Sequence, residues 1–225
     1  MEKTAKENAV GSSPIFSNAT LDVFSGYIQT DFRSFSKGLE DFTISELAEE
    51  AGVSTPTIHN LFGKKDDIAQ ELIEELILAL QNIMSKPVFD DPVKSAVFYV
   101  DSILEMYEGK EDFYRSAYMA CEKAGIFEDR ESIDSFYQQS INLAELCCKG
   151  ALKHGFLLGN INTTVLTRQL YDCHRSARQD WVIGYINLNE YRDQMLESIL
   201  MVYAADASTE CHKRIISEIN RVNSQ

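Results

Sequence analysis

The stretch from Thr43 to Ile68, TISELAEEAGVSTPTIHNLFGKKDDI, constrains the fold of this chain more than any other. Thr43 and Glu46 have the spacing of a capping box, so we expect a short helix to begin directly after Thr43. Gly52 stands where a residue in the left-handed conformation can end that helix without a steric penalty. These signals predict a first short helix that closes in a sharp turn.

A second helix is expected after the turn. Ser54 or Thr55 can cap its start, and Pro56 suits its first turn, where a missing backbone donor does no harm. Ile58 and Phe62 would pack this helix against the first. Its other face carries small polar groups that can reach base edges and phosphates in a DNA major groove: Ser54, Thr55, Thr57, His59 and Asn60. The pattern therefore predicts a helix-turn-helix whose second helix is the recognition helix.

The residues of this stretch resemble the pattern of the TetR (tetracycline-repressor type) family of bacterial transcriptional regulators. The first half of the pattern is matched by Gly38, Thr43, Leu47, Ala48, Ala51, Gly52, Val53 and Ser54. The second half is matched by Thr57, Ile58, His59, Phe62, Lys65, Asp66 and Asp67. The resemblance covers roughly residues 18 to 70, and beyond them only length and helical character agree.

The resemblance implies an all-α fold with an N-terminal three-helix head and a larger helical bundle for ligand binding and dimerisation. We place a disordered tail at 1–17, the helix-turn-helix domain at 18–65 and the body at 66–225, with a connector helix over 66–86. Together with the polar face of the recognition helix, it predicts these DNA contacts: Thr43, Ser54, Thr55, Pro56, Thr57, His59, Asn60, Lys64 and Lys65.

Two features depart from the family pattern. His59 stands where the family usually has a tyrosine that touches a phosphate. Residues 1–85 also hold six Lys and Arg against fourteen Asp and Glu, a net charge of −8. Nucleic-acid affinity normally draws on a basic patch, so we expect weak or salt-sensitive DNA binding. An alternative is a small-molecule or protein-binding dimer of the same fold with little DNA affinity.

The rest of the chain is expected to be helical. Only 4 prolines occur among 225 residues, and no alternating strand pattern is sustained. Helices are predicted near these ranges: 92–108, 111–124, 131–155, 162–186, 188–205 and 207–221. The net charge of −14, the lack of a long apolar run and an amino terminus unlike a signal peptide indicate a cytoplasmic protein with no membrane contact.

Aromatic residues and methionine gather in the middle of the chain, as in a pocket with apolar walls and a few hydroxyls. The resemblance implies a pocket for a small effector, which the side chains predict to be largely apolar or aromatic. The candidate contacts are Tyr99, Met106, Tyr107, Phe113, Tyr114, Tyr118, Phe136, Tyr137, Cys173 and His174. Periodicity alone leaves open that the same stripe is plain core.

The segment TRQLYDCHRSARQDWVIGYI has an apolar face surrounded by Arg, Asp and His. A polar pocket wall is one interpretation. An oligomer interface is the other, and we favour it because a large apolar face flanked by charges suits a subunit contact. With the following helix, the predicted dimer contacts are Leu166, Leu170, Ala177, Trp181, Met195, Ile199 and Val202.

Several other kinds of site lack a sequence signal. The five cysteines show no metal-binding spacing, and a redox or metal sensor would rest on Cys173 beside His174 alone. No phosphate loop, nucleophile elbow or zinc-protease motif is present, so catalysis is the weakest hypothesis and no cofactor or metal is expected.

The resemblance implies a mechanism. A homodimer would set two recognition helices into successive major grooves of a near-palindromic operator and repress transcription. An effector that prefers a body conformation with a tilted connector helix would weaken DNA binding, although an effector that strengthens it is also possible.

Overall fold

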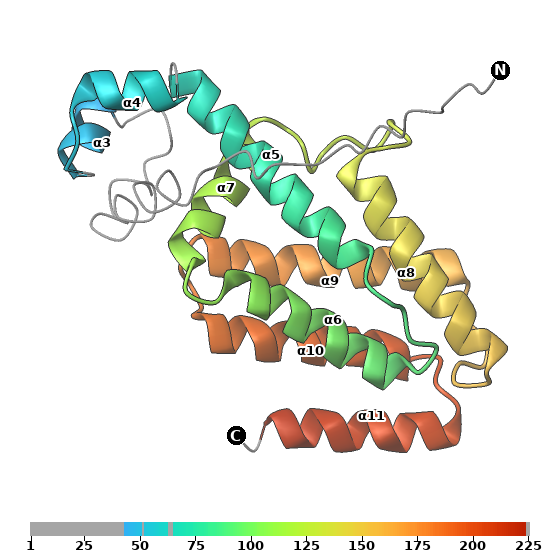
Figure 1. Ribbon diagram of the computed structural model, residues 1–225. Coiled ribbons are helices and arrows are strands. Elements are labelled where there is room, and N and C mark those ends of the chain that lie inside the picture. The colour runs from blue at the N-terminus through green and yellow to red at the C-terminus, as the bar shows by residue number, and fades with distance from the viewer. Residues whose placement is uncertain (1–42, 51, 63–64, 224–225) are drawn as a thin grey trace, which may run out of the picture.

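The computed structural model describes residues 43–50, 52–62 and 65–223, and every regular element in these ranges is an α-helix (Figure 1). The expected first helix of the head, the predicted tail and Lys64 lie outside them. The helices are α3 (Ile44–Glu50), α4 (Thr55–Phe62), α5 (Lys65–Met84), α6 (Pro92–Tyr107), α7 (Glu111–Lys123), α8 (Phe136–Lys153), α9 (Thr163–Val182), α10 (Leu188–Ala204) and α11 (Thr209–Val222). The predicted all-α fold is confirmed.

Helices α3 and α4 form the predicted helix-turn-helix. Gly52 has a φ of 64°, the left-handed conformation that ends α3. The backbone N–H of Val53 donates to the carbonyl of Ala48 at 2.9 Å and closes the turn. Ser54 caps α4, since its hydroxyl accepts the N–H of Thr57 at 3.3 Å. Ala48 and Ile58 are buried, so the two helices pack through their apolar faces.

Helix α5 connects the head to the body. Its 20 residues span about 30 Å, since each residue of an α-helix adds about 1.5 Å. The start of α5 lies beside α4, and its later turns pack on α7 (Figure 1). Ile73, Leu76, Leu80 and Ile83 form its buried stripe. Helix α5 is thus one uninterrupted helix that contacts both α4 and α7.

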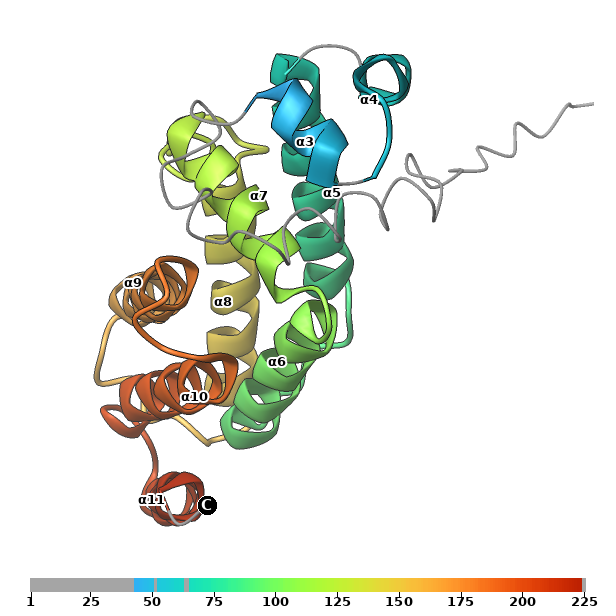
Figure 2. The same cartoon turned by 90° about the vertical axis from the view of Figure 1, so that its left-hand side faces the viewer.

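The body is a bundle in which α9 and α10 lie side by side at the centre. Helix α8 packs on α9, α6 packs on α10, and α11 lies along the outside of α10 (Figure 2). Two polar contacts fix its lower end. Asp91 caps α6 and accepts a hydrogen bond from Arg214 of α11 at 2.6 Å. The buried carboxylate of Asp206 accepts backbone N–H groups of residues 159–161 at 2.8 to 3.2 Å.

Two helix ends of the body differ from the expected ranges by more than two residues, for local reasons. The helix predicted over 131–155 begins at Phe136, because Asp129 accepts the backbone N–H groups of the next residues and Ser135 is the true cap. The helix predicted over 162–186 ends at Val182, two residues before Gly184 with its φ of 80°.

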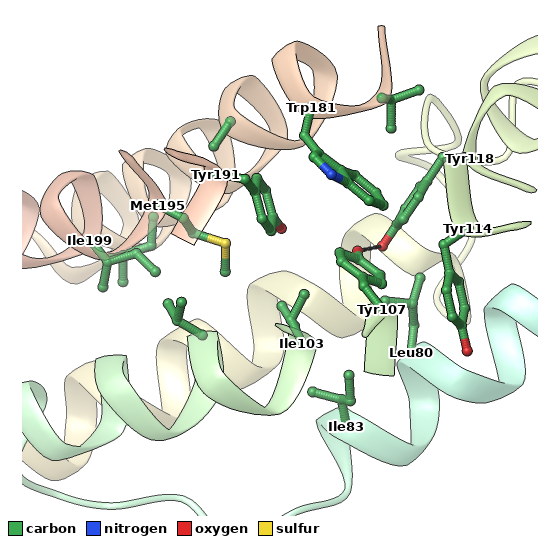
Figure 3. Packing of buried hydrophobic residues seen from close by; sticks show 14 of the residues in the cluster. Leu80, Ile83, Ile103, Tyr107, Tyr114, Tyr118, Trp181, Tyr191, Met195 and Ile199 are labelled. Carbon is green, nitrogen blue, oxygen red and sulfur yellow. Dashed lines mark hydrogen bonds between the residues drawn. The ribbon is translucent and has the colours of Figure 1, made fainter. Parts of the chain in front are cut away.

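Four large side chains fill the part of the body nearest the head, and we call Tyr107, Tyr118, Trp181 and Tyr191 the aromatic cluster (Figure 3). The rings of Tyr107 and Trp181 stack with centroids 4.5 Å apart and planes 7° apart. The hydroxyls of Tyr107 and Tyr118 are 2.5 Å apart. Stacked and hydrogen-bonded rings of this kind hold α6, α7, α9 and α10 in one arrangement.

Among the described helices, none is both long and apolar enough to cross a lipid bilayer.

Candidate DNA-binding face and ligand cavity

The outer face of α4 carries most of the predicted DNA contacts. Ser54, Pro56, His59 and Asn60 are exposed on it, and Thr55 and Thr57 are half-buried. The hydroxyls of Ser54 and Thr57 are 2.8 Å apart and cap the helix together. His59 and Asn60 are exposed further along α4, a position that suits an approach to a groove.

Two further predicted contacts flank this face. Thr43 is exposed directly before α3. Lys65 is the first residue of α5, beside the end of α4, although its side chain lies outside the described part, as does Lys64 altogether. The placement of Thr43 and Lys65 as DNA contacts thus stays a prediction.

A cavity of about 90 Å³ lies in the half of the body farther from the aromatic cluster. Its walls come from the end of α5 with the loop that follows, and from helices α6, α8, α9 and α10. The lining side chains are mostly apolar or small: Ile83, Pro87, Val88, Ala96, Phe98, Leu143, Ala144, Leu170 and Ile199, with Ser95, Ser102, Ser140, Cys147, Tyr99, Tyr171, Tyr203, His174 and Lys86.

The mouth of the cavity lies at the loop after α5. Pro87 and Phe98 are exposed lining residues, and the ring of Phe98 meets the edge of Phe89 at 5.2 Å between centroids. The ammonium of Lys86 lies 5.9 Å from the Phe98 ring and 3.9 Å from a carboxylate oxygen of Glu105. Lys86 is the one lining residue with a formal charge, and it is already paired at the rim.

The polar centre of the cavity is a pair of side chains from facing helices. The hydroxyl of Tyr99 on α6 lies 3.3 Å from Nδ1 of His174 on α9. The Nε2 atom of His174 is buried and has no hydrogen-bond partner. Burial first, and the positive charge of Arg178 second, lower the pKa of His174 to about 3. His174 is therefore neutral across the physiological pH range.

Tyr99 and His174 are the only predicted ligand contacts that line this described cavity. Tyr107, Tyr114, Tyr118, Phe113 and Phe136 are buried core residues outside its lining. Met106, Tyr137 and Cys173 are half-buried and lie outside the lining as well. The prediction grouped these residues because aromatic side chains at helical spacing look alike whether they fill a core or line a space.

Sequence reasoning missed most of the cavity walls. Ser95, Ala96, Ser102, Ser140 and Ala144 line it although none is aromatic. The available signal was size, because small side chains on facing helices leave a space that larger ones would fill.

Most of the predicted dimer contacts are buried within their own chain. Leu166, Ala177, Trp181 and Met195 are at most 2% exposed, and Leu170 and Ile199 are buried and line the cavity. Six of the seven side chains thus face the interior of their own chain, and only Val202 is half-buried. The apolar face was read correctly as a packing surface, but the helices α8, α6 and α10 of the same chain cover it.

A charged residue links the region of the cavity to α7. Arg178 is 1% exposed, and its guanidinium donates to the Glu122 carboxylate at 3.2 Å. The same group lies 4.2 Å from the ring centroid of Phe127 and 5.0 Å from that of Tyr118. Arg178 stands one helical turn after the lining residue His174 on α9, so α9 connects the cavity wall with the ion pair to α7.

The thiols do not support the redox or metal-sensor interpretation. All five cysteines are free. Burial raises the pKa of each thiol, to about 12 for Cys121 and Cys148, which disfavours the reactive thiolate. Cys173 and His174 are not brought together as ligands, since His174 turns to Tyr99, and the described residues contain no cluster that could hold a metal ion.

Comparisons with known proteins agree with this architecture. The family model of bacterial regulatory proteins of the tetR family matches residues 32–72. The TetR family protein CprB from S. coelicolor A3(2) is similar in structure, with a TM-score of 0.64 and 13% identity over 92% of this chain and 98% of that one. A gamma-butyrolactone receptor (ArpA like protein) is also similar, with a TM-score of 0.63 and 13% identity over 92% and 96% of the two chains. No curated protein matches the sequence. At these identities the structural likeness establishes the fold alone.

Proposed function

We propose that this chain is a dimeric, ligand-responsive transcriptional regulator, because residues 32–72 match the model of bacterial regulatory proteins of the tetR family and the fold is similar to that of CprB. In this proposal α4 reads a near-palindromic operator, the cavity takes a small-molecule effector, and the effector changes the affinity for DNA. The observation that carries the proposal is the position of the cavity against the end of α5, the helix that bears the head.

DNA contact is proposed through the outer face of α4. His59 and Asn60 are exposed there, and hydrogen-bond donors and acceptors of this kind can reach base edges in a major groove. The head carries little positive charge, so backbone N–H groups and the lysines at the start of α5 would supply the phosphate contacts. Affinity should therefore be weak, and its salt dependence should reflect the few lysines that contact phosphate.

The effector would act on the connector helix directly. Ile83 is in the last turn of α5, and Lys86, Pro87 and Val88 follow it, and all four line the cavity. A ligand that needs more room must displace this end of α5 or the opposite wall. Since α5 is one continuous helix, a tilt at the cavity moves α4 at the far end and alters the spacing of two heads.

A second route runs through α7. His174 lines the cavity, Arg178 follows one turn later, and Arg178 binds Glu122 of α7. Helix α7 packs along α5. A shift of α9 on ligand binding would thus reach the connector through a buried ion pair as well as through the cavity wall.

We propose a homodimer because a near-palindromic operator needs two recognition helices held at a fixed spacing. The exposed apolar side chains of the bundle are candidates for the contact between subunits, among them Leu146 of α8, Val165 of α9 and Met201 of α10. These replace the buried residues that the sequence suggested.

The acidic head favours one other function, a dimer of the same fold that binds a small molecule or a protein and has little DNA affinity. Residues 1–85 have a net charge of −8, which repels a phosphate backbone. The two functions differ in a single observable, saturable binding to a specific duplex.

The test is to select bound sequences from a pool of random DNA duplexes at low salt. Binding of the most enriched duplex is then measured by fluorescence anisotropy across a salt series. The regulator predicts enrichment of an inverted repeat and saturable binding. A folded, dimeric protein that enriches no sequence would support the alternative instead.

A matched pair of double variants locates the DNA-binding face. His59→Ala with Lys65→Ala removes one histidine and one lysine from the head, and should lower affinity for the selected duplex at least about tenfold. Lys153→Ala with His154→Ala makes the same chemical change at the exposed end of α8 and should leave affinity unchanged. Equal losses in both variants would refute a role of α4.

A further inference from the structure

His174, which lines the cavity, carries a buried polar atom without a hydrogen-bond partner, and that atom indicates which ligand chemistry the site could satisfy. His174 is 6% exposed, lines the cavity and has no partner for Nε2. A buried polar group without a hydrogen bond costs about 1 to 3 kcal/mol, so such an atom in a cavity wall is suited to a ligand. The indole Nε1 of Trp181 also lacks a partner, but Trp181 does not line the cavity.

Tyr99 influences which ring nitrogen of His174 carries the proton. The Tyr99 hydroxyl and His174 Nδ1 are 3.3 Å apart, and no other polar atom is in hydrogen-bond contact with the Tyr99 hydroxyl among the described contacts. A phenol is a stronger acid than a neutral imidazole, and the imidazole nitrogen is the better acceptor, so donation from the Tyr99 hydroxyl to Nδ1 is the favoured arrangement. In this arrangement the single proton of the neutral ring lies on Nε2, and His174 offers a hydrogen-bond donor beside the cavity.

The charge of the cavity selects against ions. Burial and Arg178 lower the pKa of His174 to about 3, so the ring carries no positive charge that could compensate a carboxylate. Lys86 is paired with Glu105 at the rim, and no acidic side chain lines the cavity that the described residues enclose. An ion inside would lose its hydration without a partner.

The size and walls of the cavity limit the rest of the ligand. Its volume of about 90 Å³ is below the range of about 300 to 1,000 Å³ of pockets for drug-sized ligands. Ile83, Leu143, Leu170 and Ile199 supply apolar walls. These walls suit a compact hydrocarbon skeleton.

We propose that the effector is a small, neutral carbonyl compound whose oxygen accepts a hydrogen bond from Nε2–H of His174 while its hydrocarbon part packs on Leu143, Leu170 and Ile199. The inference rests on the proposed function only in treating the cavity as the effector site, and its tests need no DNA. Loss of DNA binding and loss of carbonyl binding are therefore separate results.

The first test determines the tautomer of His174 without any ligand. Nitrogen-15 spectra of the histidine side chains distinguish a proton on Nε2 from one on Nδ1, and His174→Gln identifies the signal among the 4 histidines. We expect the Nε2–H form at neutral pH. A proton on Nδ1, or a protonated ring, would overturn the proposal.

The second test uses three probes of similar shape: cyclohexanone, methylenecyclohexane and cyclohexanecarboxylate. The first two differ only in an oxygen that is replaced by a CH₂ group. Wild-type protein should bind the ketone about tenfold more tightly than the alkene, the upper end of what one hydrogen bond contributes. It should bind the anion more weakly than either. Equal affinity for ketone and alkene, preference for the anion, or binding of none would overturn the proposal.

Variants separate the hydrogen bond from the packing. His174→Leu should abolish the preference for ketone over alkene while it still binds the alkene. His174→Gln keeps a side-chain N–H donor and should retain part of the preference. Ile183→Val, at an exposed residue outside the cavity lining, is the control and should keep the full preference. A preference that persists in His174→Leu would place the hydrogen bond elsewhere and refute the role of His174.

Discussion

The cavity and the aromatic cluster share three helices, α6, α9 and α10, yet one is hollow and the other is filled. Helix α6 contributes Tyr99 to the cavity and Tyr107 to the cluster. Helix α9 contributes His174 to the cavity and Trp181 to the cluster. On α10, which runs back along α9, Tyr191 belongs to the cluster, and Ile199 lines the cavity (Figure 3).

The difference lies in what faces these residues. Stacked rings meet in the cluster, where Trp181 and Tyr107 are 4.5 Å apart. In the cavity, Tyr99 and His174 face Ser95, Ala96 and Ala144, whose small side chains leave space. The cluster therefore supplies rigidity, and the cavity supplies a ligand site at the end of α5.

The largest expected effect is on stability and belongs to the cluster. Trp181→Ala should lower the free energy of unfolding by about 3 to 5 kcal/mol, because it removes a fully buried indole and leaves a hole among three rings. Urea unfolding followed by circular dichroism measures this loss. A loss below about 1 kcal/mol would show that the cluster is not the rigid half of the body.

Breaking the ion pair between Arg178 of α9 and Glu122 of α7 should lower the free energy of unfolding somewhat less. Arg178→Met removes the buried guanidinium from Glu122, whose side chain is 28% exposed and can be solvated by water. We expect a loss of about 3 kcal/mol, at the lower end for a buried pair. The double variant with Glu122→Gln gives the coupling between the two residues. If the two single losses simply add, the pair does not act as the proposed link.

The pH dependence of stability should report on the cavity. Unfolded His174 binds a proton below a pH of about 6.5, whereas the folded residue stays neutral down to a pH of about 3. The unfolded state thus gains protons first, and stability falls as the pH falls through this window, by about 1.4 kcal/mol per pH unit. His174→Gln should lack this contribution in matched urea titrations. The same slope in both proteins would show that His174 titrates normally.

The smallest effect on stability is expected from filling the cavity. Ala144→Leu adds apolar volume where space exists, so the free energy of unfolding should change by less than about 1 kcal/mol. The same variant should lose cyclohexanone binding in calorimetry. Ala177→Leu is the contrasting variant, because Ala177 is 1% exposed and lies in packed core. Overpacking there should lower the free energy of unfolding by about 1 to 3 kcal/mol.

Local signals in the sequence predicted much of the fold. Gly52, Ser54 and the apolar pair Ala48 and Ile58 predicted the helix-turn-helix, because caps and turns depend on residues close in sequence. The helix pattern of the body was also correct within a few residues at most ends. The start of α8 was missed because Asp129 forms a local turn that competes with a helix.

The site was predicted only in part, for a physical reason. Whether Tyr99 lines a cavity and Tyr107 fills a core depends on side chains from α8 and α9 that face them, and one sequence does not reveal which helices face each other. The predicted dimer face shows the same limit, since Trp181 and Met195 are apolar at helical spacing but pack against their own chain. Hydrophobic periodicity predicts which face of a helix is buried, but not which helix or subunit packs against that face.

The central claim is that a ligand in the cavity changes the affinity of the head for DNA. The most direct test measures DNA binding by wild-type protein and by Ala144→Leu as cyclohexanone is added. Fluorescence anisotropy on the selected duplex gives the affinity at each ketone concentration. We predict that saturating ketone lowers the DNA affinity of the wild type about tenfold and leaves that of Ala144→Leu unchanged. Unchanged DNA affinity in a wild-type protein whose cavity is saturated with ketone would contradict the account.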